Sequence, residues 1–394
     1  MHHEAVIVDA IRTPMAKGKA SGRLAGTHPV ELLSTALAAV TDRNQLDPAL
    51  IDDILIGCVG QVGEQSATPG RMAALAAGFP EHVPSTTIDR KCGSSQQAVH
   101  FAAQGIMAGA YDITIAGGLE SMSRVPLGMA RQDKDPFGPS VGERYDPGLV
   151  GQGISAELVA ARWGLSRREL DEYSARSHQR AEETRAGGGF DREIVPVATE
   201  SGLFDADETI RPGTTADALA ELTPAFESAE FQARFPDIGW HITAGNSSQI
   251  TDGASVMLIM SRAKAEELGL KPRARFIAFD VCGDDPLLML TGPIQGTRRV
   301  LAKAGMQIGG IDHYEVNEAF APVPLAWQRE FDADDTRLNP RGGAIALGHP
   351  LGASGARLMT TMLHALEDSN GRFGLQTMCE AGGMANATII ERLD

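Results

Sequence analysis

Short runs of aliphatic and β-branched residues alternate along the chain with longer segments whose apolar residues recur every three or four positions. The short runs predict strands at residues 5–9, 54–57 and 113–116. The longer segments predict helices at residues 29–41 and 96–108. Strands that alternate with amphipathic helices are typical of a layered α/β architecture, and that is the fold class we expect.

The second part of the chain repeats the pattern of the first after about 260 residues. The strand-like segment 51–57 resembles segment 311–317, and a turn with a cysteine at 91–95 corresponds to a turn with a histidine at 348–352. Each half then closes on a strand followed by glycines. Similar spacing over three elements predicts a duplicated fold, with chance similarity of short α/β segments as the alternative.

A stretch of different character separates the two halves. It is rich in Arg, Asp, Glu, Pro and Gly, and it holds one strong predicted helix, residues 167–185, after the cap residue Ser166. We expect an insertion on the surface of the first half, where long excursions commonly bind ligands or form oligomer contacts. The expected units are the first half at 1–120 and 243–270, the inserted loop domain at 121–242, and the second half at 271–394.

Composition and charge narrow the choice of partners. The 394 residues are 43% hydrophobic and 22% charged, which is a globular balance. The net charge of -16 argues against nucleic acid or an anionic membrane as the main partner. No apolar run approaches the roughly 18 residues of a membrane span. Neither a signal peptide nor a peroxisomal address is recognised, so we expect a cytoplasmic protein.

Four cysteines lie far apart in the sequence without a C-x-x-C pair, which indicates reduced thiols and predicts neither a disulfide frame nor a metal site. Cys92 lies in the segment DRKCGSS at a predicted strand-to-helix turn. There we expect the helix N-terminus and its unpaired N–H groups to favour the thiolate, which is the competent nucleophile. A lone cysteine is more often a small core residue, which we expect of Cys58 and Cys282.

Two further segments carry candidate chemistry. Residues 339–355 read NPRGGAIALGHPLGASG, with five glycines around His349 and a predicted helix at 356–366. The glycines let backbone and ligand approach the imidazole, and the apolar flank should tune its pKa, although a buried core histidine is the usual alternative. Residues 378–384 read MCEAGGM and place Cys379 at the end of a strand. We expect these groups to form one site with Cys92 at the junction of the halves.

The segment around His349 matches, at every fixed position, the histidine signature of the thiolase family, N-x-x-G-G-x-[apolar]-[S/A]-x-G-H-P-x-G-x-[S/T]-G. The segments NEAF at 317–320 and TAGNSSQ at 243–249 also resemble family elements, and family-like sequence covers essentially the whole chain. The CGSSQQ and MCE runs resemble actinobacterial thiolases of fatty-acid or steroid catabolism. The resemblance implies a thiolase-like, duplicated α-β-α-β-α layered fold with a loop-domain insertion in the first half.

The resemblance also implies roles for single residues. Cys92 would be the nucleophile, His349 the base that activates it, and Cys379 the acid and base of the two half-reactions. One oxyanion site would be His349 with a water held by Asn317, and the other the backbone N–H groups of Cys92 and Ala381. Asn317 could instead be an ordinary turn residue. Ala381 stands where the family usually has glycine, and a positive φ there would be strained.

Coenzyme A is the expected co-substrate, and no other cofactor is implied. Ser248 stands where thiolases contact the pantetheine arm, although it could be a helix N-cap. Thr223 stands where many thiolases have a basic residue near the CoA nucleotide, so we expect Arg211 or another residue of the insert to supply that contact. The other residues expected to bind substrate are Gln152, Met289 and Phe320. The resemblance implies a homodimer or homotetramer.

The favoured function is a degradative 3-ketoacyl-CoA thiolase that works by a ping-pong mechanism through an acyl-Cys92 intermediate. Residues 150–157 lack the His-Met pair with which acetoacetyl-CoA thiolases line the acyl pocket, which favours a larger acyl group. A biosynthetic acetoacetyl-CoA thiolase is the main alternative. A ketosynthase relative is disfavoured by Cys379, and a non-catalytic CoA-binding homologue by the presence of all four expected catalytic groups.

Overall fold

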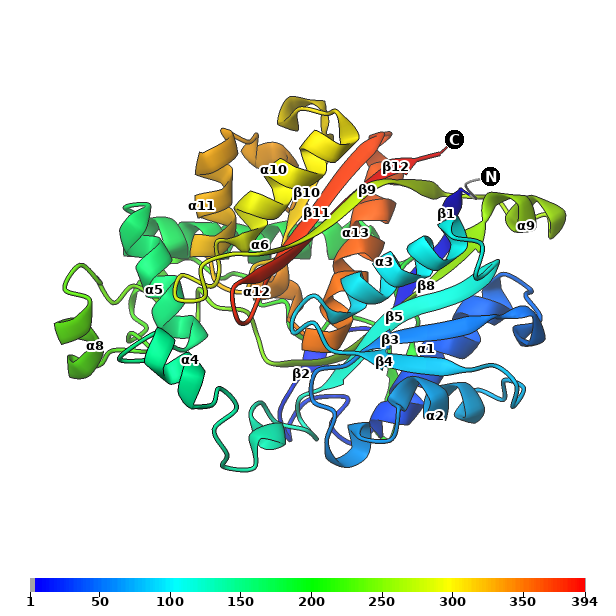
Figure 1. The fold of residues 1–394 in the computed structure, drawn as a ribbon, viewed down its shortest axis with the longest axis horizontal. Coiled ribbons are helices and arrows are strands. Elements are labelled where there is room, and N and C mark those ends of the chain that lie inside the picture. The colour runs from blue at the N-terminus through cyan, green and yellow to red at the C-terminus, as the bar shows by residue number, and fades with distance from the viewer. Residues whose placement is uncertain (1–3, 394) are drawn as a thin grey trace.

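The computed structural model describes residues 4–393, and one large mixed sheet of ten strands runs through the centre of this part of the chain (Figure 1). The strand order is β10-β11-β12-β9-β1-β8-β5-β3-β4, and β2 pairs with β8. The strands of this sheet are β1 (Ala5–Arg12), β2 (Ala16–Lys17), β3 (Asp53–Gly57), β4 (Ser85–Ile88), β5 (Ile113–Ser121), β8 (Thr251–Ser261), β9 (Ala274–Gly283), β10 (His313–Val316), β11 (Phe373–Glu380) and β12 (Met384–Arg392).

The sheet consists of two halves with the same topology. In the first, β1, β8 and β5 are antiparallel neighbours and β3 is parallel to β5; in the second, β9, β12 and β11 are antiparallel and β10 is parallel to β11. The halves join where Val6 and Ile7 pair with Arg275 and Ala274. The repeated segments therefore become β3 and β10 at equivalent positions, and the predicted duplicated fold is confirmed.

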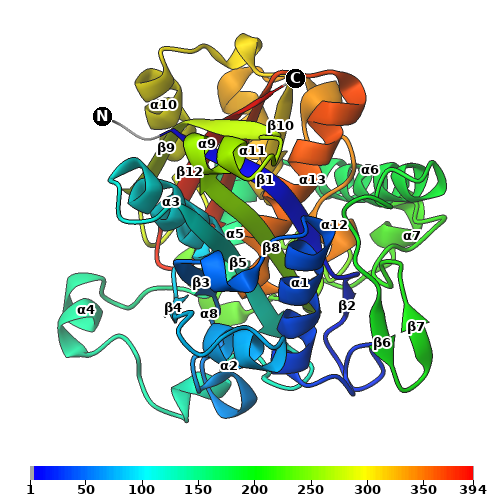
Figure 2. The same cartoon turned by 90° about the vertical axis from the view of Figure 1, so that its right-hand side faces the viewer.

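Helices form three layers around the two half-sheets. The outer layer of the first half contains α1 (Pro29–Arg43) and α2 (Pro69–Ala76), and the outer layer of the second half contains α10 (Gly292–Ala304) and α11 (Pro322–Phe331). Between the halves lie α3 (Ser94–Met107) and α13 (Ser354–Ser369), and α13 contacts strands of both (Figures 1 and 2). The remaining helices outside the insert are α9 (Arg262–Glu267), α12 (Ala344–Leu347) and the short 3-10 turns η1 (Pro48–Leu50), η2 (Gly63–Gln65), η4 (Ile308–Gly310), η5 (Asp335–Arg337) and η6 (Leu351–Ala353).

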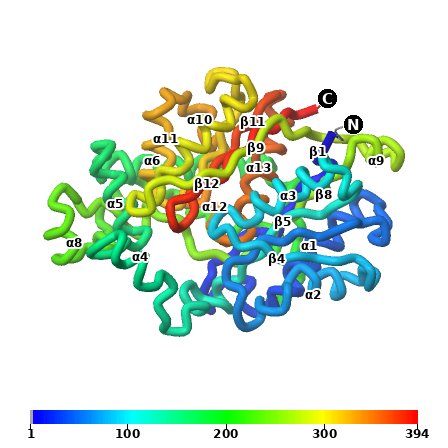
Figure 3. The backbone as a smooth tube through the Cα atoms, viewed as in Figure 1, coloured from blue at the N-terminus to red at the C-terminus, as the bar shows by residue number. Residues whose placement is uncertain are grey.

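Helix α13 illustrates why the central layer forms. Its residues from Ser354 to Leu366 are all buried, because each side of the helix meets a different half of the molecule. A helix buried on all sides must be apolar or have its polar groups paired. The strands at either end of the chain lie on the two sides of β9: Ile7 of β1 and Arg392 of β12 both pair with Ala274, and the two ends of the described chain lie close together (Figure 3).

The insert packs differently from our expectation. Its elements are η3 (Met129–Arg131), α4 (Pro139–Arg144), α5 (Gln152–Arg162), α6 (Arg167–Ala186), β6 (Val197–Thr199), β7 (Gly202–Phe204), α7 (Ala216–Ala220) and α8 (Ala229–Arg234). Helix α6 begins at the predicted cap, where Ser166 and Glu169 form a capping box. However, α5 packs on α11 and α6 on α12, so these helices lie on the second half and not on the surface of the first.

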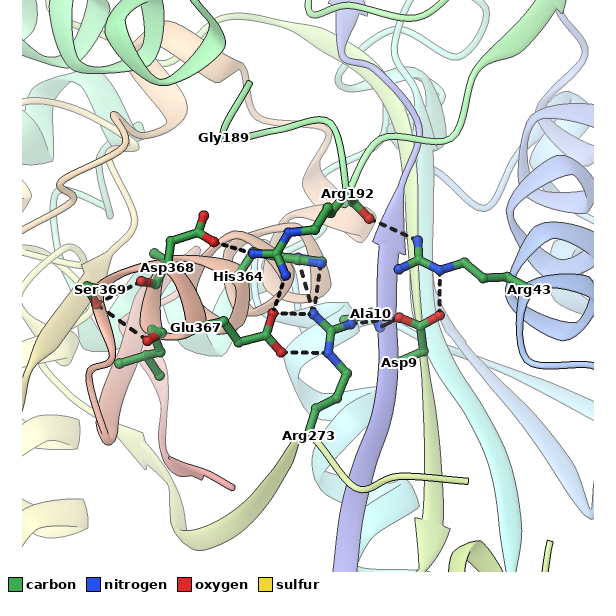
Figure 4. A network of polar contacts seen from close by, with 12 residues as sticks. Asp9, Ala10, Arg43, Gly189, Arg192, Arg273, His364, Glu367, Asp368 and Ser369 are labelled. Atoms are coloured by element: carbon green, nitrogen blue, oxygen red, sulfur yellow. Dashed lines mark hydrogen bonds and ion pairs between the residues drawn. The ribbon is translucent and has the colours of Figure 1, made fainter. Parts of the chain in front are cut away.

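Ion pairs fasten the insert and both halves at their junction (Figure 4). Arg273, just before β9, bonds to Asp9 of β1 at 2.7 Å and to Glu367 of α13 at 2.8 Å. Glu367 also pairs with Arg192 of the insert at 3.0 Å, and Asp9 with Arg43 of α1 at 3.0 Å. Five segments distant in sequence thus share one network. No helix within residues 4–393 has the length and apolar character to cross a membrane.

Candidate active site

The N-termini of the two central helices meet, and this contact assembles the candidate site. The amide of Ala356 in α13 donates to the hydroxyl of Ser95 in α3 at 2.9 Å. A Cβ at Gly355 would lie 2.3 Å from the amide nitrogen of Gln96, so glycine is needed for this approach. Cys92 precedes α3 and His349 precedes α13, so equivalent turns of the two halves bring both residues to one place.

The histidine-containing loop packs directly on the ends of first-half strands. Gly57 is the last residue of β3, and a Cβ there would lie 2.8 Å from the carbonyl oxygen of Gly352. Gly118 lies within β5, and a Cβ there would lie 2.0 Å from the same oxygen. The buried carboxylate of Glu120 accepts the amide of Gly352 at 2.8 Å and the amide of Val59 at 3.0 Å. A single carboxylate therefore holds the loops of both halves together, a role that its position in the sequence does not reveal.

Cys92 is 4% exposed and lies among hydrogen-bond donors. Burial, followed by the nearby Glu380 carboxyl, raises the pKa of the Cys92 thiol to about 12. The N–H groups of Cys92 and Ala381 and the side chain of Gln152 act in the opposite direction. The N–H groups therefore favour the thiolate in the predicted direction, but desolvation and the Glu380 charge outweigh them, so the net pKa of the thiol is raised.

Cys379 ends β11 beside Cys92. Burial first, and then the charge of Cys92, raise the pKa of the Cys379 thiol well above its ordinary value, because the two sulfurs are close neighbours. The chain leaves the strand through Gly382 and Gly383, with φ of 94° and 75°. Ala381 is not among the residues with positive φ, so alanine is accommodated there without the strain considered from the sequence.

His349 is buried, and its hydrogen bonds define its tautomer. The hydroxyl of Ser354 donates to the carbonyl of Pro350 at 2.8 Å, so the Nδ1 atom of His349, 2.6 Å away, must donate to Ser354 Oγ. This assignment leaves a lone pair on Nε2, which has no partner among residues 4–393. Burial, then Arg357, lower the pKa of His349 to about 3, so the imidazole is a neutral base. The sequence predicted that the flank would tune this pKa but gave no direction.

Asn317 follows β10 and is fully buried. Its amide oxygen and nitrogen have no hydrogen-bond partner among the described residues, whereas its backbone amide donates to Thr377 at 3.1 Å. Neighbouring Glu318 accepts bonds from Tyr173 at 2.8 Å and Ser177 at 2.7 Å of α6. A buried carboxamide without partners is costly unless water or substrate satisfies it, which favours a site residue over an ordinary turn residue.

The expected CoA contacts lie along a groove between the insert and the second half. Arg211 is exposed and its guanidinium donates to Gln249 at 3.3 Å. The residues that line this groove are His178, Arg211, Thr214, Leu219, Ala244, Gly245, Ser247, Gln249 and Ile345. Ser248, next to two of them, is half-buried, and the element that follows it is strand β8, so the helix N-cap alternative is wrong. Thr223 is exposed.

Three further residues, Gln152, Phe320 and Met289, were predicted to bind substrate, and of these Gln152 lies close to Cys92. Gln152 begins α5 and reaches the sulfur of Cys92. Phe320 is half-buried, and its ring meets Phe226 edge-on at 6.2 Å between centroids. Phe226 fills the space that Gly153 leaves empty, a contact that the sequence did not suggest. Met289 is buried with φ of 52°, and no contact between it and Cys92 is seen.

The other cysteines are core residues, as predicted. Cys58 is fully buried and Cys282 is 5% exposed, and neither forms a disulfide. Burial raises the pKa of the Cys282 thiol to about 11, so it is inert at neutral pH. Within residues 4–393, no group of His, Cys, Asp and Glu side chains is arranged to hold a metal ion.

Comparison with known proteins places this geometry in context. Residues 5–263 match the family model "Thiolase, N-terminal domain", and residues 270–392 match "Thiolase, C-terminal domain". A steroid 3-ketoacyl-CoA thiolase of Mycobacterium tuberculosis is 47% identical over 99% of this chain and 94% of its own length. A 3-ketoacyl-CoA thiolase of Pseudoalteromonas translucida is 43% identical over 98% of each chain. The crystal structure of an acetyl-CoA acetyltransferase of Bacillus anthracis superposes with a TM-score of 0.89 at 35% identity, covering 100% of this chain and 99% of the other.

Proposed function

Because the chain belongs to the thiolase family, we propose that it is an acyltransferase that cleaves a 3-ketoacyl-CoA with CoA, yielding acetyl-CoA and a shortened acyl-CoA. Relatives that carry the name 3-ketoacyl-CoA thiolase are 41–47% identical over almost the whole chain. The observation that carries the proposal has two parts: two buried thiols and two backbone donors act on one another, and the helix that follows the neutral imidazole of His349 meets the helix that follows Cys92.

In the first half-reaction, Nε2 of His349 takes the proton of the Cys92 thiol. Because the resting thiol has a pKa of about 12, the thiolate forms only as the substrate arrives and the base acts. The sulfur attacks the 3-keto carbon, and the amides of Cys92 and Ala381 stabilise the oxyanion. The bond between carbons 2 and 3 then breaks, leaving an acyl group on Cys92 and the enolate of acetyl-CoA.

The enolate needs a donor at its oxygen and a proton at its carbon. The newly protonated Nε2 of His349, together with a water held by the unpartnered amide of Asn317, serves the oxygen. Cys379 donates its proton to the carbon, which releases acetyl-CoA. In the second half-reaction the Cys379 thiolate deprotonates incoming CoA, whose sulfur attacks the acyl-Cys92 thioester and frees the enzyme.

The groove beside Ser248 and Arg211 is the proposed CoA site. It leads along α6 and the histidine-containing loop, and Arg211 brings a positive charge that suits the phosphates of CoA. The Arg211 guanidinium donates to the neutral side-chain amide of Gln249, so the charge of Arg211 is available to a phosphate. Arg211→Ala should therefore raise the KM for CoA with little change in kcat.

The acyl group that we propose is larger than acetoacetyl. The relative from M. tuberculosis is named a steroid 3-ketoacyl-CoA thiolase. In this chain, α5 begins with Gln152 and Gly153 near the nucleophile. The second candidate is an acetoacetyl-CoA thiolase, which the similarity to the acetyl-CoA acetyltransferase of B. anthracis supports.

Cleavage rates on acetoacetyl-CoA and on 3-ketoacyl-CoAs of increasing size, including a ring-bearing acyl chain, separate the two candidates. We expect kcat/KM to rise with acyl size, and a steep preference for acetoacetyl-CoA would reverse the order of the candidates. Cys92→Ala is the control: it should fold normally and show neither turnover nor an acylated peptide in mass spectrometry.

A cytoplasmic homo-oligomer is also proposed. Within residues 4–393, strand β4 forms an end of the large sheet and pairs only with β3, so its other edge is available for a partner strand. The nearby side chains of Phe101 in α3 and Leu75 in α2 are exposed by 42% and 40% in the single chain. Light scattering coupled to size-exclusion chromatography measures the oligomeric state, and a monomer at micromolar concentration would contradict this proposal.

A further inference from the structure

Glu380 is a buried carboxyl at the active site without an assigned role. It follows Cys379 at the end of β11 and is fully buried. Among residues 4–393, neither carboxyl oxygen makes a hydrogen bond of ordinary geometry, and the nearby backbone N–H of Asn386 lowers the pKa of the group less than burial raises it. An acid in such a place is costly, because a buried polar group normally requires a partner.

The carboxyl lies against the main chain of the nucleophile turn. A Cβ on Gly93 would be 1.8 Å from Glu380 Oε1 and 2.7 Å from its carboxyl carbon, so Glu380 occupies the space next to Gly93. Gly93 is the N-cap of α3 and directly follows Cys92. A residue of the second half thus packs on the turn that positions the nucleophile of the first half, and a side chain at position 93 would force the Glu380 carboxyl to move.

The charge of Glu380 acts on the thiols around it. Burial is the largest cause of the raised pKa of Cys92, Cys379 and Cys282. The Glu380 carboxylate contributes a smaller shift in the same direction to each. Arg90 is the cation that opposes burial at Glu380 itself. Burial prevails and raises the pKa of Glu380 to about 8, so the group is mostly neutral at pH 7 and ionises in mildly basic solution.

We propose that Glu380 is a positioning residue whose protonation state controls how readily Cys92 and Cys379 lose their protons. The neutral acid packs on Gly93 and permits a thiolate beside it. The ionised form places a second negative charge next to the sulfur in a site of low dielectric, where like charges repel strongly. The inference rests on the proposed function only in that it names these two thiols as the reacting groups.

The test measures the alkylation rate of Cys92 by iodoacetamide between pH 6 and pH 10, with peptide mapping to separate it from Cys379. In the unchanged enzyme, a plot of the logarithm of the alkylation rate against pH should flatten near pH 8. Above that pH Glu380 is ionised, and its negative charge opposes formation of the Cys92 thiolate. Glu380→Gln keeps the shape and removes the charge. Its rate should rise without a plateau and exceed that of the unchanged enzyme about tenfold at pH 9, the effect of one pKa unit.

Asp89→Asn is the matched control, because Asp89 is a carboxylate in the same loop that is partly exposed and paired with Lys91 at 2.7 Å. It should leave the profile unchanged. Coincident profiles for Glu380→Gln and the unchanged enzyme, both folded by circular dichroism, would overturn the proposal. If Glu380→Gln does not fold, the pH profile of the unchanged enzyme is the test. A Cys92 alkylation rate that rises tenfold per pH unit through pH 8 would then overturn the proposal. The assay contains no acyl-CoA, so a failure of the proposed thiolase reaction would not affect it.

Discussion

Ser354→Ala tests whether the hydrogen bond to Nδ1 makes His349 a base. Ser354 is fully buried and has two short contacts, 2.6 Å to His349 Nδ1 and 2.8 Å to the carbonyl of Pro350. Removing the hydroxyl leaves the Nδ1–H group buried without an acceptor. The imidazole can then keep its tautomer with an unsatisfied donor, or move the proton to Nε2 and lose the lone pair that accepts the Cys92 proton.

The size of the effect follows from the cost of that unsatisfied group. A buried donor without a partner costs about 1–3 kcal/mol. Since each 1.36 kcal/mol on the barrier is tenfold in rate, kcat should fall about 5- to 150-fold. The KM for the acyl-CoA should change little, because Ser354 is screened from the substrate by the imidazole that it orients.

Stopped-flow measurement of Cys92 acylation isolates the step in which His349 acts. Ser354→Thr, which keeps the hydroxyl, should retain most of the acylation rate. Ser369→Ala is a matched control near the other end of α13, where an exposed serine donates to the carbonyl of Ala365 at 2.8 Å and contacts no histidine among the hydrogen bonds of the described residues. A folded Ser354→Ala enzyme with an unchanged acylation rate would refute the tautomer argument.

Three further predictions concern the same site. Asn317→Ala should lower kcat by about 10²–10³, the usual effect of losing one oxyanion donor; an unchanged kcat on the preferred substrate would exclude this role. Gly93→Ala should lower the melting temperature, because its Cβ would meet Glu380 Oε1 at 1.8 Å; an unchanged melting curve would show that the carboxyl has room to move. Since the pKa of His349 is lowered to about 3, the base is already unprotonated above about pH 4. The kcat/KM profile should therefore have no acidic limb near pH 6.5, where an ordinary histidine titrates, and an inflection there would contradict the burial of the imidazole.

Much of the fold was predictable because it depends on local patterns. The alternation of strand and helix periodicities located β1, β3, β5, α1 and α3 to within a few residues. The repeated spacing predicted the duplication, and the glycine-rich segment around His349 predicted a site. These properties are encoded by residues a few positions apart, where side-chain periodicity and backbone freedom act directly.

The direction in which the active-site pKa values shift was not predictable from the sequence. The helix N-terminus before Cys92 suggested a thiolate, but burial by segments of the second half and the carboxyl of Glu380 reverse the outcome. Likewise, Ser354 looked like one position of a motif, and only its contacts with His349 and Pro350 show how it selects a tautomer. Desolvation and charge interactions depend on distances between groups that are far apart in the chain.

The sequence by itself determined which chemical groups are present: two cysteines, a histidine and an asparagine, each beside glycines or a strand end. Only the tertiary structure decided that the N-termini of α3 and α13 meet, that helices α5 and α6 of the insert pack on the second half, and that Glu380 fills the space beside Gly93. The physical reason is that each of these contacts joins residues more than one hundred positions apart. Such contacts are selected by the packing of whole layers, and no local pattern specifies them.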